Sequence, residues 1–336
     1  MTVLVTGGAG YLGSHMTVKL VNNGYEVIIV DNFCNSSEKI IPRINELASK
    51  EITVINQDLC DSSGVDKIFH DYDIDAVIHF AALKSAPRSV VEPLDYFYNN
   101  FTSTLNVLNA MKKYNVNKFV FSSSATVYGN PKKVPITEDM PLAAVNPYGR
   151  TKLVIEDMLR DIHNADDNMN IAILRYFNVV GTHPSGRIGE NPKGIPANIM
   201  PYISQVAVGH IDILPITGTD YPTRDGTGIR DYIHVEDLIE GHIAALRWMD
   251  TNSGLLTVNL GTGKGYTVKE VVYAYEKASG KTIPTEEVAR RPGDIAECYA
   301  DVALAKELLG FEATRDLDDM CKDSWNWQSN NPNGYL

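Results

Sequence analysis

The sequence predicts an α/β protein built on a doubly wound parallel sheet, followed by a smaller mixed α/β region. Short runs that are apolar at consecutive positions recur through the first half, at 3–5, 27–30, 54–55, 76–80, 119–121 and 171–174. Such runs suit strands that are buried on both faces of a parallel sheet. The longer helical patterns between them supply the right-handed crossover connections that parallel strands require.

The second half differs in character from about residue 178 onward. Proline and glycine gather between residues 182 and 201 and again between 217 and 228, and loops of this composition lie on surfaces and often carry binding groups. We therefore expect a large domain over 1–178 and a substrate domain over 179–336. Strand-like and helical stretches at 231–260 predict a segment that returns to the large domain.

Charge and cysteine usage exclude several function classes. A net charge of −12 argues against a nucleic-acid surface, which needs a basic stripe. The four cysteines form no C-x-x-C pair, so neither a metal site nor a disulfide framework is indicated. The chain opens without a charged and apolar leader, and no apolar run approaches the ~20 residues of a membrane span. A soluble, cytoplasmic protein is the expectation.

A glycine-rich turn follows the first predicted strand. Gly7, Gly10 and Gly13 connect that strand to a helix, where they permit a tight turn and close approach of a pyrophosphate to the helix N-terminus. Asp31 ends the second strand pattern, where a carboxylate accepts from ribose hydroxyls and repels a 2′-phosphate, so NAD is favoured over NADP. Asp58 is placed to hold the adenine amino group. The alternatives are a turn or helix-cap role for Asp31 and an ordinary loop role for Asp58.

Tyr148 and Lys152 are four residues apart, so they share one face of a helix. Asn146 and Pro147 suit entry to that helix, and Ser124 follows the strand at 119–121, at the sheet edge where chemistry is expected. A phenol titrates near pH ~10, and a neighbouring ammonium lowers that pKa. Bringing the pKa to ~7 needs roughly 4 kcal/mol of differential stabilisation.

The same Tyr-x-x-x-Lys spacing occurs three more times, so spacing alone selects nothing. Among the rival pairs, a helix end separates Tyr114 from Lys118. Gly129 and Pro131 interrupt the pair Tyr128/Lys132, and Tyr273/Lys277 lies on a solvated helix face. The pair in NPYGRTK is therefore the predicted catalytic one.

Several long motifs together resemble one family. They are VTGGAGYLGSH, VIHFAALK, FSSSATVYG, NPYGRTK, LRYFN, HPSGRIGENPKGIP, DGTGIRDYIHVEDL and RRPGD. On these motifs the chain resembles the extended short-chain dehydrogenase/reductase family nearly end to end, and within it the UDP-glucose 4-epimerases. The resemblance implies a Rossmann-type NAD-binding domain at 1–178 and a UDP-sugar domain at 179–336.

The resemblance also implies a mechanism. Tyr148 takes the proton of the sugar 4-hydroxyl while NAD takes hydride from carbon 4, Lys152 lowers the tyrosine pKa and binds ribose hydroxyls, and Ser124 hydrogen-bonds the 4-oxygen. A 4-keto sugar turns over and receives the hydride on its opposite face. Relatives are commonly homodimers, so a homodimer is expected.

By resemblance, further residues are assigned to ligands. Cofactor contacts beyond the catalytic three are Gly7, Gly10, Tyr11, Leu12, Gly13, Asp31, Asn32, Asn35, Ser36, Asp58, Leu59, Phe80, Ala81, Ala82, Lys84, Asn99 and Phe177. Contacts to the UDP-hexose are Asn178, Asn198, Ile199, Thr217, Arg230, Arg291, Asp294 and Cys298.

Cys298 stands where epimerases restricted to glucose and galactose carry a tyrosine. A smaller side chain leaves room for a 2-acetamido group, so we expect activity on UDP-N-acetylglucosamine and UDP-N-acetylgalactosamine as well. The alternatives are restriction to one sugar pair and a role for Cys298 as merely a small buried residue. Pro87 and Arg88 replace the Gly and Glu of many relatives, and the proline lacks a backbone donor near the cofactor loop. Thr217 replaces an aromatic residue found in some relatives.

Three other functions occur on this fold. Sugar 4,6-dehydratases carry an Asp-Glu pair after the serine or threonine, whereas this chain has Ala125 and Thr126, which have no acid-base capacity near pH 7. A non-catalytic NAD-sensing protein would usually lack the tyrosine or the lysine. A simple dehydrogenase would consume NAD stoichiometrically.

Overall fold

The structure is a computed structural model that describes residues 1–291 and 293–335, so Pro292 of the RRPGD motif lies outside the described residues. The chain divides into two compact units whose segments interleave in sequence. The first unit comprises Met1–Gly129, Leu142–Arg175 and His242–Val258, and the second comprises Asn130–Pro141, Tyr176–Gly241 and Asn259–Leu336.

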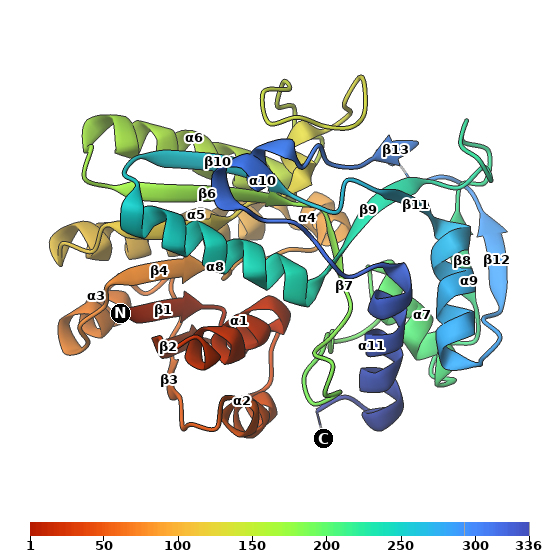
Figure 1. Cartoon of the computed structure of the whole chain (residues 1–336), viewed down its shortest axis with the longest axis horizontal. Coiled ribbons are helices and arrows are strands. Elements are labelled where there is room, and N and C mark those ends of the chain that lie inside the picture. The colour runs from red at the N-terminus through yellow and green to blue at the C-terminus, as the bar shows by residue number, and fades with distance from the viewer. Residues whose placement is uncertain (292, 336) are drawn as a thin grey trace. The chain divides into compact units, whose positions relative to one another are not determined.

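A seven-stranded sheet forms the centre of the first unit (Figure 1). Its strands, in spatial order, are β10 (Leu255–Leu260), β6 (Asn170–Tyr176), β5 (Lys118–Ser122), β4 (Ala76–His79), β1 (Thr2–Thr6), β2 (Glu26–Asp31) and β3 (Thr53–Asn56). From β6 to β3 every neighbouring pair is parallel. The predicted doubly wound parallel sheet is confirmed, because the order reverses at β1.

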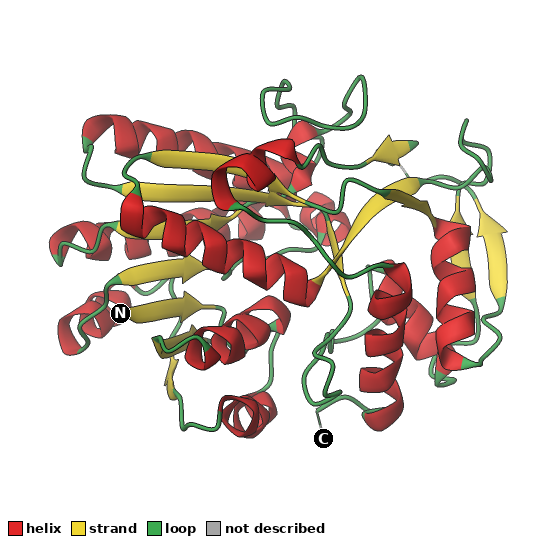
Figure 2. Ribbon diagram, in the orientation of Figure 1, coloured by secondary structure: helices red, strands yellow, loops and turns green. Residues whose placement is uncertain are grey.

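Helices connect these strands and cover the sheet (Figure 2). They are α1 (Tyr11–Asn22), α2 (Ile41–Ala48), α3 (Ser62–Asp71), α4 (Ala86–Val91), α5 (Pro93–Lys113), α6 (Pro147–Ala165) and α8 (Val235–Thr251), with short 3-10 turns at η1 (Glu38–Ile40) and η2 (Ala125–Tyr128). Helix α5 packs against α3 and α6, and α1 packs against α2. In Figure 1, α1 lies in front of the sheet and α5 and α6 lie behind it.

The consecutive apolar runs form the core of the first unit. All four residues of β4 are buried, as are Phe119, Val120 and Phe121 of β5. Phe119 and Ile171 share one apolar cluster with Val107 and Leu159 of the covering helices, and the intervening residues Val120 and Ala172 are buried as well. Burial on both faces explains why these strands lack an alternating pattern.

The second unit is a mixed assembly of small sheets and helices. Its strands are β7 (Asn178–Val180), β8 (Leu214–Thr217), β9 (Ile229–His234), β11 (Gly265–Thr267), β12 (Thr285–Val288) and β13 (Glu297–Cys298), and its helices are α7 (Ile199–Ala207), α9 (Val268–Ser279), α10 (Ala303–Leu309) and α11 (Leu317–Asn330). Strand β9 pairs with β7, β11 and β13, while β8 pairs with β12. A separate apolar cluster joins α7, α9 and α11.

Among the residues that the structure describes, no helix is long and apolar enough to cross a membrane. The segment at 231–260 forms β9, α8 and β10, and its last strand stands beside β6 in the large sheet. The assignment of a cofactor to 1–178 and of a UDP-sugar to 179–336 stays a prediction.

Candidate active site

The turn between β1 and α1 lets the protein backbone approach a ligand closely. Gly7 has a φ of +66°, and a Cβ on Gly13 would lie 2.2 Å from the Gly7 carbonyl oxygen, so any side chain at 13 would open the turn. Gly10 is the helix N-cap, so the capping residue offers no side chain to the backbone amides of the first turn of α1. The positive end of the helix dipole is therefore presented by backbone amides, as a pyrophosphate site requires.

Asp31, at the end of β2, holds the loops around this turn. Its carboxylate accepts hydrogen bonds from the backbone N–H of Ala9 at 3.0 Å, the N–H of Phe33 at 2.8 Å and the hydroxyl of Ser36 at 2.8 Å. The predicted acid thus lies beside the glycine turn. Asp58 accepts from the N–H of Cys60 at 2.8 Å and from the side-chain amide of Asn32 at 3.1 Å, which links the ends of β2 and β3.

Helix α6 carries the predicted catalytic pair. Asn146 caps it by accepting from the N–H of Gly149 at 2.8 Å, and Pro147 occupies the first turn, where its missing N–H costs no hydrogen bond. Tyr148 is 8% exposed and Lys152 is 3% exposed, so both lie on the buried face of the helix. The Lys152 ammonium donates to the Ser122 carbonyl oxygen at 2.7 Å and lies 4.7 Å from the centre of the Phe121 ring.

Ser124 is held beside Tyr148 at the carboxyl end of β5. It is the N-cap of η2, where its hydroxyl oxygen accepts from the N–H of Thr126 at 3.2 Å. A hydrogen bond between the Ser124 and Tyr148 side chains lowers the pKa of the phenol. The structure therefore brings Ser124, Tyr148 and Lys152 together at one edge of the sheet.

The two pKa values differ from the simple expectation of an activated phenolate. Burial raises the pKa of Tyr148 to about 12, a larger effect than the hydrogen bond from Ser124. Burial lowers the pKa of Lys152 to about 7, and the charge of Glu156 acts in the opposite direction. Both shifts have one cause, because a buried site disfavours whichever form is charged. In the protein without ligands, removal from water therefore raises the pKa of Tyr148 by more than the neighbouring groups lower it.

The other three Tyr-x-x-x-Lys pairs lie where the sequence predicted. Tyr114 is the C-cap of α5 and Lys118 opens β5, so a turn separates them. Tyr128 is buried beside Arg175, whose guanidinium donates to its hydroxyl at 3.0 Å. Tyr273 is 71% exposed on α9. Only the pair on α6 is buried together.

The remaining predicted cofactor residues divide between the units. The first unit holds them all except Phe177, which lies in the second. The Lys84 ammonium lies 6.0 Å from the centre of the Tyr11 ring, and Phe80 packs on His242 with ring centres 5.0 Å apart. Asn99 donates to the side chain of Asn100 at 3.0 Å.

Asn100 is a residue that sequence reasoning missed. Its side chain accepts from the N–H of Leu83 at 2.8 Å and donates to the Thr151 hydroxyl at 3.0 Å, so one buried amide joins the loop after β4 to helix α6. The signal was present, because an asparagine in the middle of a helix is unfavourable unless its amide is bonded.

Pro87 costs no hydrogen bond within its helix, and the expected loss of a donor toward the cofactor loop stays a prediction. It lies in the first turn of α4, whose N-cap is Ser85, and the amides of a first helical turn have no partner within the helix. Arg88 forms an exposed ion pair with Glu92 at 2.6 Å. The departures in this loop therefore fit its helical structure.

In the second unit, β9 and β13 bring three predicted substrate residues together. Cys298 stands in register opposite Arg230, and the Arg230 guanidinium lies 3.8 Å from the Asp294 carboxylate. Burial raises the pKa of Cys298 to about 11, so its thiol is neutral near pH 7. Arg291 is exposed, and the carbonyl oxygen of Arg291 accepts from the N–H of Asp294.

Asp231, beside Arg230, was also missed. Its buried carboxylate accepts from the N–H groups of Thr262, Gly263 and Ala300 at 2.9, 3.0 and 3.1 Å. These bonds fix the end of β13 against β9. The carboxylate thereby sets where Cys298 stands relative to Arg230.

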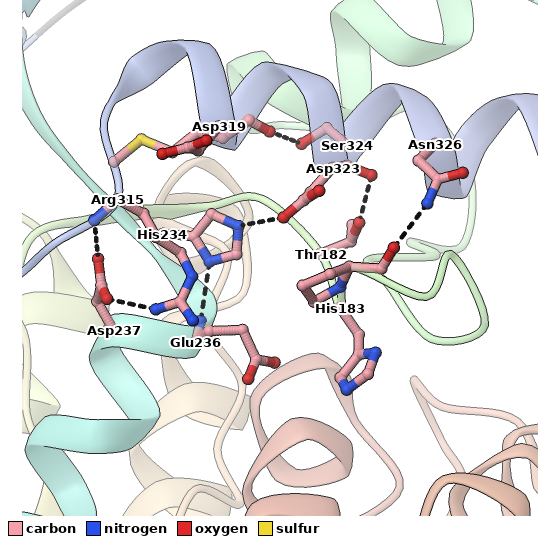
Figure 3. Close-up of polar contacts among 12 residues, drawn as sticks. Thr182, His183, His234, Glu236, Asp237, Arg315, Asp319, Asp323, Ser324 and Asn326 are labelled. Atoms are coloured by element: carbon pink, nitrogen blue, oxygen red, sulfur yellow. Dashed lines mark hydrogen bonds and ion pairs between the residues drawn. The ribbon is translucent and has the colours of Figure 1, made fainter.

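Strand β9 is anchored at its other end by His234 (Figure 3). His234 Nδ1 accepts from the N–H of Glu236 at 3.0 Å, so Nε2 carries the proton and donates to Asp323 of α11 at 3.2 Å. Thr182 donates to the carbonyl oxygen of Asp323 at 2.6 Å. The close-up shows this histidine side chain connecting β9 to α11 through its hydrogen bond with Asp323.

The other predicted substrate residues lie at ends of elements in the second unit. Asn178 opens β7 opposite Tyr232, Asn198 and Ile199 begin α7, and Thr217 ends β8. Asn198 is exposed, and its amide lies 3.5 Å from the Glu190 carboxylate. Their contacts with a sugar nucleotide stay predictions.

Comparison with known proteins agrees with this architecture. The family model described as GDP-mannose 4,6 dehydratase matches residues 4–324. The UDP-glucose 4-epimerase of Bacillus subtilis is 57% identical over all of this chain and 99% of its own length. The crystal structure of UDP-glucose 4-epimerase from Bifidobacterium longum with NAD+ and UDP is 51% identical, with a TM-score of 0.96 over 99% of this chain and 100% of that one.

A third relative has a broader substrate name. The UDP-Glc/GlcNAc 4-epimerase from Campylobacter jejuni is 36% identical, with a TM-score of 0.85 over 98% of this chain and 99% of that one. The chain belongs to the extended short-chain dehydrogenase/reductase family, in its UDP-glucose 4-epimerase branch.

Proposed function

We propose that this chain is a cytoplasmic, NAD-dependent UDP-hexose 4-epimerase that interconverts UDP-glucose and UDP-galactose through a 4-keto sugar. The observation that carries the proposal is the buried cluster of Ser124, Tyr148 and Lys152 at the carboxyl edge of the sheet. The sequence identity of this chain to UDP-glucose 4-epimerases over their whole length supports the proposal. The four cysteines are free thiols, which suits a reducing cytoplasm.

The residues of the first unit fit NAD. A Cβ would fill the glycine turn, the first turn of α1 has no capping side chain, and the Asp31 carboxylate lies beside that turn. Asp31 would hold the adenosine ribose, and Asp58 would hold the adenine amino group. The chemistry that bound NAD supplies is reversible acceptance of hydride from carbon 4 of the hexose.

The chain's own residues then handle the proton. The Tyr148 oxygen receives the proton of the sugar 4-hydroxyl, and the Ser124 hydroxyl hydrogen-bonds the same sugar oxygen. Lys152 lies one helical turn away and supplies positive charge when protonated, which favours the phenolate. Because burial raises the pKa of Tyr148 to about 12, this positive charge is required before the tyrosine serves as a base near pH 7.

The second unit is proposed to hold the UDP moiety. The Arg230 and Arg291 guanidinium groups suit phosphate oxygens, and the Asp294 carboxylate suits ribose hydroxyls. Arg230 is only 19% exposed and already has a carboxylate nearby, so its charge is oriented by the protein. Ala125 and Thr126 follow Ser124 without an acid or a base, which favours epimerisation over dehydration.

Incubation of the purified protein with UDP-galactose tests the function. We expect UDP-glucose to form, measured by NMR of the anomeric protons, without net consumption of added NAD. Stoichiometric loss of NAD would instead indicate a dehydrogenase. A protein that carries NAD but forms no UDP-glucose would indicate the sensor.

We further propose that UDP-N-acetylglucosamine and UDP-N-acetylgalactosamine are substrates. Cys298 supports this proposal, because a neutral thiol is small and its place is fixed opposite Arg230. The likeness to the UDP-Glc/GlcNAc 4-epimerase of Campylobacter jejuni also supports it.

Substitution of one residue separates the two sugar pairs. Cys298→Tyr is expected to abolish conversion of UDP-N-acetylglucosamine while sparing conversion of UDP-galactose, because the larger ring fills the space for the acetamido group. Cys298→Ala is the matched control and should keep both activities. Equal loss of both activities in Cys298→Tyr, or no N-acetyl activity in the unmodified protein, would refute the proposal.

A homodimer through α4, α5 and α6 is the final part of the proposal. An apolar surface is exposed along these helices, formed by Val90, Val91, Leu94, Tyr98, Leu105 and Val154. Leu94 and Tyr98 are one helical turn apart on α5, and exposed apolar side chains on one helix face favour association. Leu94→Glu should convert a dimer to a monomer in size-exclusion chromatography with light scattering. An unmodified protein that elutes as a monomer would contradict it.

A further inference from the structure

Glu156 is a buried carboxylate on the same helix face as the catalytic pair. Tyr148, Lys152 and Glu156 follow one another at four-residue spacing along α6, and the Glu156 side chain is fully buried. A buried carboxylate is costly unless it is paired and hydrogen-bonded, so each of its partners informs its purpose.

Two arginines and a serine satisfy this carboxylate. Arg175 of β6 donates to it through Nε at 3.0 and 3.2 Å and through a terminal nitrogen at 2.6 Å. Arg160 donates at 2.8 Å, and the Ser123 hydroxyl donates at 2.5 Å. Arg175 is 2% exposed, so this is a buried, charge-assisted network.

The serine contact fixes the segment that holds the catalytic groups. Ser123 lies between Ser122, whose carbonyl accepts from Lys152, and Ser124, which hydrogen-bonds Tyr148. Arg175 also reaches the far end of η2, where it donates to the Tyr128 hydroxyl at 3.0 Å. The network therefore binds side chains on both sides of Ser124, at Ser123 and at Tyr128.

Charge is the second link between Glu156 and the pair. The groups that surround Lys152 are Tyr148 and Glu156 on α6, the Ser122 carbonyl and the Phe121 ring on β5, and His79 on β4. Burial lowers the pKa of His79 to about 3, with Lys152 adding to the effect, so this ring is neutral near pH 7. Arg175 and Arg160 add positive charge near Glu156. Glu156 is the one anion in this set, among the described residues.

We propose that Glu156 is a positioning residue for the reaction, which rests on the proposed epimerase function. Its carboxylate fixes the segment that presents Ser124 and favours the protonated form of Lys152 from one helical turn away. Neither action needs contact with substrate or cofactor, so the residue acts through Ser123 and Lys152.

The test is an NMR titration of Lys152 in protein labelled with ¹³C at the lysine side chains, with the signal assigned by Lys152→Met. In Glu156→Gln the titration midpoint of Lys152 should fall by about one pH unit, since a nearby negative charge has been removed. The alkaline limb of the kcat profile should move in the same direction. Asp157→Asn is the matched control, because its exposed carboxylate is adjacent in sequence and pairs with Arg160 at 2.9 Å on the solvated side of α6, and it should move neither the Lys152 midpoint nor the alkaline limb.

Ser123→Ala isolates the geometric part of the proposal, since it removes one hydrogen bond and keeps every charge. We expect kcat to fall about tenfold with the Lys152 midpoint unchanged. Should Glu156→Gln fail to fold with Arg175 left unpaired, the kcat of Ser123→Ala decides.

An unchanged Lys152 midpoint in folded Glu156→Gln, or an unchanged kcat in Ser123→Ala, would overturn the proposal. The epimerase function fails separately. If the unmodified protein is inactive but the Lys152 midpoint still falls in Glu156→Gln, the epimerase function is overturned. The electrostatic effect of Glu156 on Lys152 then still holds.

Discussion

Helices α6 and α9 carry the same Tyr-x-x-x-Lys spacing and place it in opposite environments. On α6, Tyr148 and Lys152 are buried, and the lysine donates to a backbone carbonyl. On α9, Tyr273 is 71% exposed, and Lys277 forms an ion pair with Asp318 at 2.5 Å. Two lysines that are equivalent in the sequence pattern therefore have different environments, because one is buried and the other is exposed to water.

The pKa directions follow from these environments. Burial lowers the pKa of Lys152 to about 7, whereas the hydrogen bond and charge of Asp318 raise the pKa of Lys277. A buried lysine whose pKa lies near neutral pH is typical of functional sites, whereas a fully charged lysine in a surface ion pair is typical of a solvated helix face. Environment gives a Tyr-Lys pair its chemistry, and spacing merely permits it.

The largest expected contrast is catalytic. Tyr148→Phe should lower kcat for UDP-galactose by about 10²–10⁴-fold, because it removes the group that takes the 4-hydroxyl proton. Tyr273→Phe makes the same chemical change on α9 and should leave kcat unaltered. Comparable losses in both variants would mean that the contrast between the helices is not functional.

A second contrast concerns stability against pH. The folded pKa of Lys152, about 7, is below its unfolded value near ~10.4, so the unfolded state binds more protons between them and stability rises with pH. Lys152→Met removes a buried group that is costly when charged, and should raise the free energy of unfolding by a few kcal/mol at pH 6, roughly, and by less at pH 9.5.

Lys277→Met is the control for this measurement, made by urea unfolding at the two pH values. Its exposed ammonium stays charged throughout this range in both states, so no such pH dependence should appear. A gain for Lys152→Met that is equal at pH 6 and pH 9.5 would contradict the depressed pKa.

The smallest expected effect is on the α9 ion pair. Asp318→Asn should leave the urea midpoint of unfolding unchanged within experimental error, because both partners are more than half exposed and water screens the pair. The measurement is again urea unfolding near pH 7. A clear drop of the urea midpoint would show that this ion pair is more buried in solution than the structure indicates.

The sequence predicted the elements whose signals are local. Apolar runs such as 119–121 became strands because they are buried on both faces, and Asn146 and Pro147 became the start of α6 because capping depends on adjacent residues. The class of the site followed from Ser124, Tyr148 and Lys152 for the same reason, since strand ends and helix spacing place them.

The network behind the site could not be predicted in the same way. A glutamate in a helix, such as Glu156, is ordinarily a solvated residue, and only the approach of Arg175 from β6 makes it a buried one. Likewise, the pKa of Tyr148 depends on how completely water is excluded, which no spacing records. Asp231 and Asn100 were missed because their partners are distant in sequence.

The interleaving of the two units has a consequence for biosynthesis. The first unit needs residues 242–258, and the edge strand β10 joins β6 only after the whole stretch 176–241 has been made. A ribosome adds roughly 5–20 residues per second, so the unfinished sheet exposes the edge of β6 for several seconds while the chain grows. An exposed strand edge is a site of mispairing, so the nascent chain is expected to require chaperone protection until β10 emerges.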